Sequence, residues 1–105
     1  MTDLRTLAER HLSQAKADKN GRSAHMFLHE GPLRQTVIAL TEGSRLEEHV
    51  SPHAASLQVI TGRVVLTSGV GDTELGAGEL APVPPERHGL TAAEDSVILL
   101  TTVKG

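Results

Sequence analysis

With 105 residues, 38% of them hydrophobic and 22% charged, the chain is long enough for one globular domain and too short for two. The formal net charge is -3 and Phe27 is the sole aromatic residue, which argues against a nucleic-acid partner. Duplex binders need a basic face, and single-strand binders stack bases on aromatic rings. The absence of cysteine excludes disulfides, thiolate zinc sites and a cysteine nucleophile.

No apolar run of signal-peptide length opens the sequence, and no segment approaches about 18 continuous apolar residues. We therefore expect a cytoplasmic protein that neither is secreted nor spans a membrane. Its core must be aliphatic, built from Val, Leu, Ile and Ala. Self-association would be unsurprising for so small a core.

The first periodic stretch covers residues 2–19. Apolar positions recur there at spacings of three and four, which predicts a helix with one apolar stripe: Leu4, Leu7, Ala8, His11, Leu12 and Ala15. Thr2 can cap its start and Asn20-Gly21 can end it. His11 lies in the stripe beside charged neighbours, so we interpret it as a helix-packing residue half exposed to water.

After Gly21 the periodicity changes to that of short strands separated by turns rich in Gly and Pro. The predicted strands cover residues 24–29, 35–41, 46–50, 56–60, 63–68, 73–75, 80–83, 88–92 and 96–103. Such spacing is typical of an antiparallel sandwich or barrel. The predicted organisation is an N-terminal helix over residues 1–20 and one β domain over residues 21–105, with the helix on its own sheet or against a partner subunit.

Three histidines lie in two turn-rich stretches that could meet in the fold. His49 and His53 follow the Gly43 turn, and His88 follows Pro84-Pro85. Imidazole is a common ligand of zinc, iron, copper and nickel, and a site needs at least three ligands on a rigid backbone. From spacing alone, exposed loop histidines are the more ordinary interpretation.

Other polar residues could complete such a site. Glu47 shares the parity of His49 on a regular strand and could face inward, whereas Glu48 should face outward. Gln58 is the one amide in an apolar strand, and a buried amide needs a partner, although an exposed position is equally compatible. Glu30 and Glu42 are interpreted as solvated surface charges.

Two further groups of residues are weaker candidates for a functional site. His25 and His29 share a strand face, and we interpret them as solvent-side or dimer-side residues. A Ser-His-Asp triad can be assembled on paper from Ser51, His88 and Asp95, but nothing places Ser51 on a sharp nucleophile turn.

The spacing of glycines, prolines and histidines resembles the two motifs of the cupin superfamily. Gly43-x5-His49 followed by Gly62 is similar to the first motif, and Gly78-x5-Pro84 followed by His88 is similar to the second. The resemblance covers about residues 34–103. It implies a mainly β fold, a cupin jelly-roll β-barrel of antiparallel strands, here with one N-terminal α-helix, and commonly a homodimer, as in small single-domain bacterial cupins.

The ligand set departs from the metal-binding pattern of that superfamily. Ser51 stands where the second His belongs, Ala55 stands where the Glu belongs, and His88 arrives one residue early. His49 and His88 remain, and His53 could replace the lost second His. We therefore predict one divalent metal ion, Fe, Zn, Cu, Ni or Mn, held by His49, His53 and His88 with an open coordination position.

Three functions are compatible with these residues, and the fold alone does not choose among them. The first is a metal-binding cupin whose ion acts as a Lewis acid or binds dioxygen in an aliphatic barrel. The second, favoured by the missing His and Glu, is a metal-free cupin that binds a small molecule or serves as a dimeric binding or sensor module. The third is a structural barrel used for dimerisation. A barrel lined with Val, Leu and Ile and without aromatic side chains predicts a small acid, a diketone or a short aliphatic chain as its ligand.

Overall fold

One helix and nine strands make up the described part of the chain, residues 1–49, 54–69, 71–84 and 87–104 of the computed structural model, with only the backbone described for Glu48 and His49. These elements are α1 (Leu4–Ala17), β1 (Arg22–Glu30), β2 (Leu33–Leu40), β3 (Arg45–His49), β4 (Ala55–Thr61), β5 (Arg63–Ser68), β6 (Gly71–Gly76), β7 (Leu80–Pro82), β8 (His88–Ala92) and β9 (Ser96–Val103). Strands β5, β8 and β9 have the predicted bounds, and the other strand ends differ from the prediction by at most two residues. No helix in these residues is long and apolar enough to cross a membrane.

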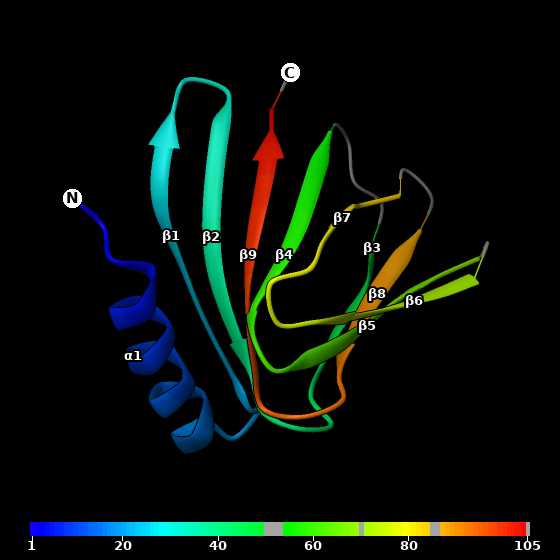
Figure 1. Cartoon of the computed structure of the whole chain (residues 1–105), viewed down its shortest axis with the longest axis horizontal. Coiled ribbons are helices and arrows are strands. Elements are labelled where there is room, and N and C mark those ends of the chain that lie inside the picture. Colours follow the sequence, from blue (N-terminus) through cyan, green and yellow to red (C-terminus); the bar gives the residue numbers. More distant parts are fainter. Residues whose placement is uncertain (50–53, 70, 85–86, 105) are drawn as a thin grey trace.

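The strands form two antiparallel sheets that face each other (Figure 1). Sheet A has the order β1-β2-β9-β4-β7, and sheet B has the order β3-β8-β5-β6. The chain passes repeatedly from one sheet to the other, as it does from β2 to β3 and from β3 to β4, so apart from the pairs β1-β2 and β5-β6 the neighbours in each sheet are not consecutive in sequence. The predicted fold class, a mainly β barrel of antiparallel strands with one N-terminal helix, is confirmed.

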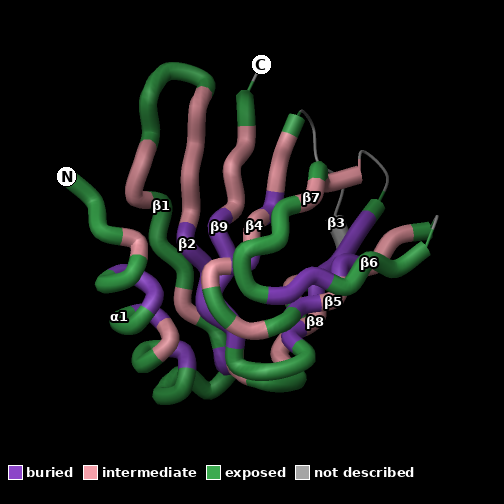
Figure 2. The backbone as a smooth tube through the Cα atoms, viewed as in Figure 1, coloured by how far each residue is buried: buried purple, intermediate pink, exposed green. Residues whose placement is uncertain are grey.

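The helix α1 packs on the face of sheet A that points away from sheet B (Figures 1 and 2). Its buried side chains form one cluster with outward-facing residues of β2 and β9: Leu7, Ala8, Ala15, Val37, Ala39, Val97 and Leu99. Phe27 is partly buried against the same cluster. The helix therefore covers its own sheet, which is one of the two arrangements that the sequence left open.

Aspartates, and not the predicted Thr2 and Asn20-Gly21 caps, define the ends of α1. Asp3 is the N-cap, and its Oδ1 accepts the backbone N–H of Arg5 at 3.0 Å. Asp18 is the C-cap, and its Oδ2 accepts the backbone N–H of Asn20 at 2.9 Å. At the N-cap, a carboxylate accepts backbone N–H groups that have no partner within the helix. At the other end, the backbone N–H of Asp18 donates to the Ala15 carbonyl at 3.1 Å, and the helix ends at Ala17, before Asn20.

A second cluster fills part of the space between the sheets. Because successive strand residues point to opposite faces, Ile98 faces inward while Val97 and Leu99 face α1. The buried members of this inner cluster are Ile38, Leu40, Leu57, Val59, Val64, Leu66, Leu75, Leu90, Ala92 and Ile98. All buried hydrophobic residues that the structure describes are aliphatic, as predicted.

The turn that carries the chain from β4 in sheet A to β5 in sheet B requires glycine. Gly62 has φ +89, and a Cβ atom there would lie 2.3 Å from both the Asp95 carbonyl oxygen and Ser96 Oγ. Ser96 is fully buried, and its Oγ accepts the backbone N–H of Arg63 at 2.9 Å. A left-handed backbone and a close approach of the start of β9 therefore explain the glycine of the first motif.

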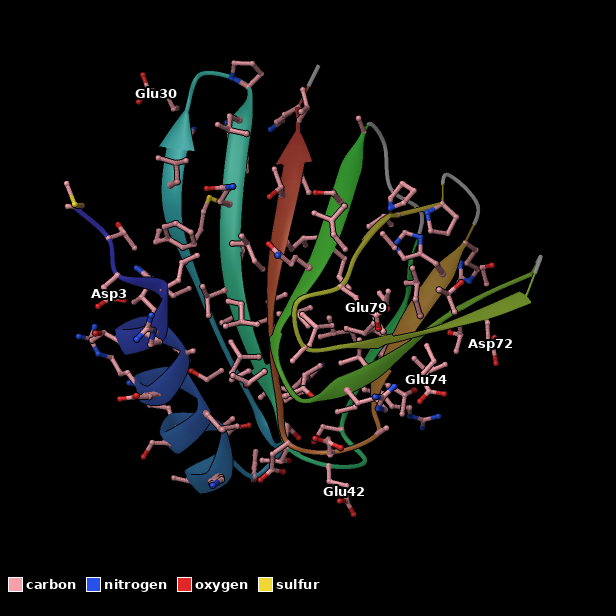
Figure 3. The ribbon with its side chains drawn as sticks, viewed as in Figure 1. Asp3, Glu30, Glu42, Asp72, Glu74 and Glu79 are labelled. Atoms are coloured by element: carbon pink, nitrogen blue, oxygen red, sulfur yellow. The ribbon has the colours of Figure 1, made fainter. Side chains whose placement is uncertain are left out.

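Acidic side chains lie on the outside of the barrel. Figure 3 labels six of them, and all six are exposed: Asp3, Glu30, Glu42, Asp72, Glu74 and Glu79. The interpretation of Glu30 and Glu42 as surface charges is confirmed.

Candidate functional site

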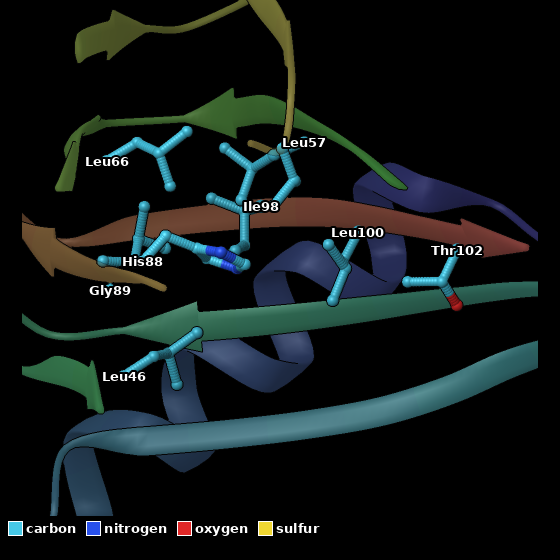
Figure 4. A pocket seen from close by; sticks show the side chains of 10 residues that line it. Leu46, Leu57, Leu66, His88, Gly89, Ile98, Leu100 and Thr102 are labelled. Carbon is cyan, nitrogen blue, oxygen red and sulfur yellow. The ribbon is translucent and has the colours of Figure 1, made fainter. Parts of the chain in front are cut away.

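An apolar cavity of about 160 Å³ lies between the two sheets (Figure 4). Residues from both sheets line it: Leu46, Leu57, Leu66, Val83, His88, Gly89, Leu90, Ile98, Leu100 and Thr102. Among the described lining residues, only His88 and Thr102 have polar side chains. The cavity therefore joins an aliphatic wall to two places where a ligand could form hydrogen bonds.

Strand alternation and cross-strand pairing place these side chains. Ile98, Leu100 and Thr102 are alternate residues of β9, so they point to the same side of sheet A. Leu57 of β4 pairs directly with Leu100 and continues this wall. Thr102 was not predicted as a site residue from the sequence. It could have been, because it alternates with Ile98 and Leu100 along the last predicted strand and so points to the same face.

His88 is the first residue of β8 and is buried, with 4% of its surface exposed. Figure 4 shows its imidazole reaching into the cavity beside Ile98. Among the three predicted metal ligands, this is the side chain that the structure describes, and it lines the barrel interior.

His49 is the last residue of β3, and its Cα is paired with that of His88. The register of β3 shifts between Leu46, which pairs with Leu90, and His49, so three steps along β3 correspond to two along β8. Such a bulge inserts one residue into one strand of a pair. Leu46 lines the cavity, and on a regular strand His49 would have the opposite parity. The bulge instead brings the backbone of His49 level with His88.

His53 lies outside the described residues, as does the side chain of His49. Within the described part of the chain, no three His, Asp or Glu side chains are grouped so that they could hold a metal ion. A metal site at His88 would therefore take its remaining ligands from side chains outside the described set, to which the predicted ligands His49 and His53 belong.

The two other residues considered for this site lie elsewhere. Glu47 follows the cavity-lining Leu46, is exposed, and borders a shallow groove with Arg45 and Arg87. The expectation that Glu47 could face inward is wrong, because Leu46 lines the cavity and successive strand residues point to opposite faces. Gln58 follows the cavity-lining Leu57, so its half-buried side chain faces away from the cavity.

The Ser-His-Asp combination is not assembled around His88. His88 begins β8, whereas Asp95 follows the far end of that strand. Asp95 Oδ1 accepts the backbone N–H of Glu42 at 2.8 Å, and its Oδ2 lies 3.8 Å from Lys16 Nζ. Ser51 lies outside the described residues. Asp95 thus ties the end of α1 to the loops that lead into β3 and β9.

A second buried histidine lies on the opposite side of sheet A. His11 of α1 is 7% exposed, its Nδ1 is 2.8 Å from Ser23 Oγ, and its ring stacks on that of His25 with centroids 5.7 Å apart. Burial lowers the pKa of His11, and the charges of His25 and Arg10 lower it further. The expectation of a half-exposed His11 is wrong, because β1 places Ser23 and His25 against the helix. His25 is exposed as predicted and also contacts α1.

No protein-family model and no curated protein sequence matches the chain. Solved structures do resemble it. A cupin superfamily protein from Desulfitobacterium hafniense has a TM-score of 0.76 at 13% identity, over 84% of this chain and 82% of that one. An RmlC-like cupin from Shewanella frigidimarina has a TM-score of 0.73 at 21% identity, over 82% and 78% of the two chains.

A larger enzyme contains a similar unit. Salicylate 1,2-dioxygenase from Pseudaminobacter salicylatoxidans has a TM-score of 0.79 at 14% identity, and the match covers 93% of this chain and 33% of the enzyme. At such identities the likeness establishes the fold and not the activity. Two facing antiparallel sheets, the motif glycines and these matches agree: the chain has the fold of the small cupin proteins.

Proposed function

We propose that this cupin-fold protein holds one divalent metal ion through His49, His53 and His88 and uses it on a small molecule bound in the barrel cavity. The observation that carries the proposal is the pairing of His49 with His88 across β3 and β8. His88 is buried in the cavity wall, so an ion bound to it would lie beside the ligand space.

The residue types fit such an ion. Imidazole nitrogen suits iron, zinc, copper and nickel, and three protein ligands leave a coordination position open. The bound ion would supply Lewis-acid chemistry. His88 would orient the ion from a strand, which holds a side chain more rigidly than a loop does.

The cavity wall would contribute water exclusion and positioning. Leu46, Leu57 and Leu100 surround the space beside His88 with side chains that offer no competing hydrogen bonds. Electrostatic interactions are stronger in such an apolar environment than in water. A ligand there would be oriented by its polar end at His88 and by the shape of the aliphatic wall.

Metal-free binding is a second candidate function, and the apolar cavity favours it. The described wall of that cavity is almost wholly aliphatic, and Ser51 and Ala55 stand where the usual cupin set has two ligands. In this case His88 would act as a hydrogen-bonding group for the ligand.

Elemental analysis of untagged protein, loaded in turn with Fe, Zn, Cu, Ni and Mn and then dialysed, separates the two functions. We expect about one ion per chain in the wild type, as a three-histidine site predicts. His88→Ala, His49→Ala and His53→Ala should each lose the ion while keeping a cooperative thermal transition. His29→Ala, which removes an exposed histidine of β1, is the matched control and should keep it.

Two results would overturn the metal site. One is a wild type that retains none of the five ions. The other is a folded His88→Ala variant with the same metal content as the wild type. Either result would leave the two metal-free functions, a barrel that binds a small molecule and a structural barrel used for dimerisation.

A further inference from the structure

We infer that the cavity takes short-chain aliphatic carboxylates of about four carbons, with the carboxylate at His88 and the chain against the leucine wall. The inference deepens the proposed function and rests on it in one respect, because the ion at His88 would provide the countercharge. The size and the polarity of the cavity support it independently of the ion.

The volume limits the size of the ligand. An apolar cavity of about 150 Å³ lined by Leu, Ile and Phe holds benzene, which has six non-hydrogen atoms. The cavity between the sheets has about 160 Å³. A ligand of roughly six non-hydrogen atoms therefore fits, and butanoate, with four carbons and two oxygens, has that number.

The wall selects an aliphatic chain with one polar end. Six side chains of the lining are Leu or Ile: Leu46, Leu57, Leu66, Leu90, Ile98 and Leu100. Figure 4 shows His88 beside Ile98, while Thr102 lies beyond Leu100 further along β9. A chain bound at His88 would therefore contact leucine and isoleucine side chains first, and each buried CH₂ raises affinity about fourfold.

Charge selects a carboxylate over a neutral head group. Three neutral imidazoles would leave the 2+ charge of the ion uncompensated, and no carboxylate occurs among the described residues that line the cavity. An uncompensated charge is costly in an apolar environment. An anionic ligand neutralises it, and the ion in turn pairs with a carboxylate that would otherwise be buried alone.

Isothermal titration calorimetry with four probes tests the inference on metal-loaded protein and on chelator-treated protein. Acetate, butanoate and octanoate vary the chain length, and butan-1-ol keeps the chain but lacks the charge. We expect butanoate to bind the loaded protein about fifteenfold more tightly than acetate, from two further CH₂ groups. Octanoate should bind no more tightly than butanoate, because its additional carbons exceed the volume.

Two variants test whether butanoate binds inside the cavity. Leu57→Phe fills part of the cavity and should weaken butanoate binding at least about tenfold, with metal content and the thermal transition retained. Gln58→Leu is the matched control, because Gln58 follows Leu57 on β4 and its half-buried side chain faces away from the cavity. It should change butanoate affinity by less than about twofold.

The outcomes separate the two proposals. If the protein retains none of the five ions and still binds butanoate with the expected chain-length limit, the metal site is overturned and the size and polarity of the inferred ligand stand. Three results on metal-loaded protein would overturn the inference alone: no butanoate binding, butan-1-ol binding as tightly as butanoate, or affinity that keeps rising to octanoate. Undiminished binding to Leu57→Phe would also overturn it, since the ligand would then lie outside the cavity.

Discussion

The two faces of sheet A present alternate residues of the same strands: α1 packs on the outer face, whereas the inner face borders the cavity between the sheets. On β9, Leu99 packs against the α1 cluster while its neighbour Leu100 lines the cavity. Small residues such as Ala39 and Ala8 let the helix lie close to the outer face. On the inner face, sheet B stands across from larger side chains that do not fill the space between the sheets. The difference separates the face of the sheet that packs against the helix from the face that lines the candidate site.

The two buried histidines show the same contrast. His11 and His88 are 7% and 4% exposed, so burial does not distinguish them. His11 lies in a filled interface, with Ser23 at its Nδ1 and His25 stacked on its ring. His88 lies next to about 160 Å³ of open cavity. The adjacent space, and not burial, makes His88 the candidate for binding.

Truncation of neighbouring leucines should show the largest difference between the faces. Leu99→Ala removes a buried side chain from the packed face and should lower the free energy of unfolding by about 2–5 kcal/mol. Leu100→Ala should cost less, about 1–2 kcal/mol, because Leu100 is half buried and already borders a cavity. Urea denaturation followed by far-UV circular dichroism measures both. Equal losses would mean that the two faces are packed alike.

Replacing a side chain with a larger one should destabilise the protein less than truncation does. The loss should again be smaller on the inner face of sheet A than on the outer face. Ala39→Leu adds three carbons beneath α1, where Ala39 is fully buried, and should destabilise the protein by about 1–3 kcal/mol. Leu57→Phe extends into the cavity and should cost less than about 1 kcal/mol. The same denaturation experiment checks this pair. A Leu57→Phe variant as unstable as Ala39→Leu would show that the cavity is not available to a larger side chain.

The smallest expected effect is a pH dependence of stability that arises from His11, on the side of sheet A that α1 covers. The lowered pKa of His11 means that, below its usual value of 6.5, the unfolded chain binds more protons than the folded one. The stability contributed by neutral His11 is therefore present above pH 6.5 and is lost as the pH falls towards the lower pKa of the folded state. Unfolding midpoints in urea at pH 5, 6, 7 and 8 should decline on the acid side, and His11→Gln should flatten that decline. An identical decline in the wild type and in His11→Gln would show that His11 does not cause the loss of stability at acid pH.

Much of the fold follows from local sequence patterns. Bounds for β5, β8 and β9 were predicted correctly because alternating or continuous aliphatic runs end at clear Gly, Pro and charged positions. The helix was predicted from its stripe, but its ends were misplaced, since several polar residues nearby could each serve as a cap. The predicted homodimer and cytoplasmic location stay predictions, and light scattering would check the first.

The candidate site was less accessible from local patterns. His88 was predicted from its motif position and lines the cavity, whereas Glu47 was misplaced, because its neighbour Leu46 lines the cavity and successive strand residues point to opposite faces. The burial of His11 also escaped prediction. It depends on Ser23 and His25 of β1, which meet the helix only after the chain has folded back on itself.

By itself, the sequence determined an aliphatic barrel with a leading helix and glycine turns, and it placed His49 and His88 in the two motif stretches. Those properties depend on residue type and short-range spacing. Tertiary structure alone decided that β3 is bulged so that His49 pairs with His88, that α1 covers its own sheet, and that a cavity remains between the sheets. Register and the separation of packed sheets arise from contacts between residues distant in sequence, which no local pattern specifies.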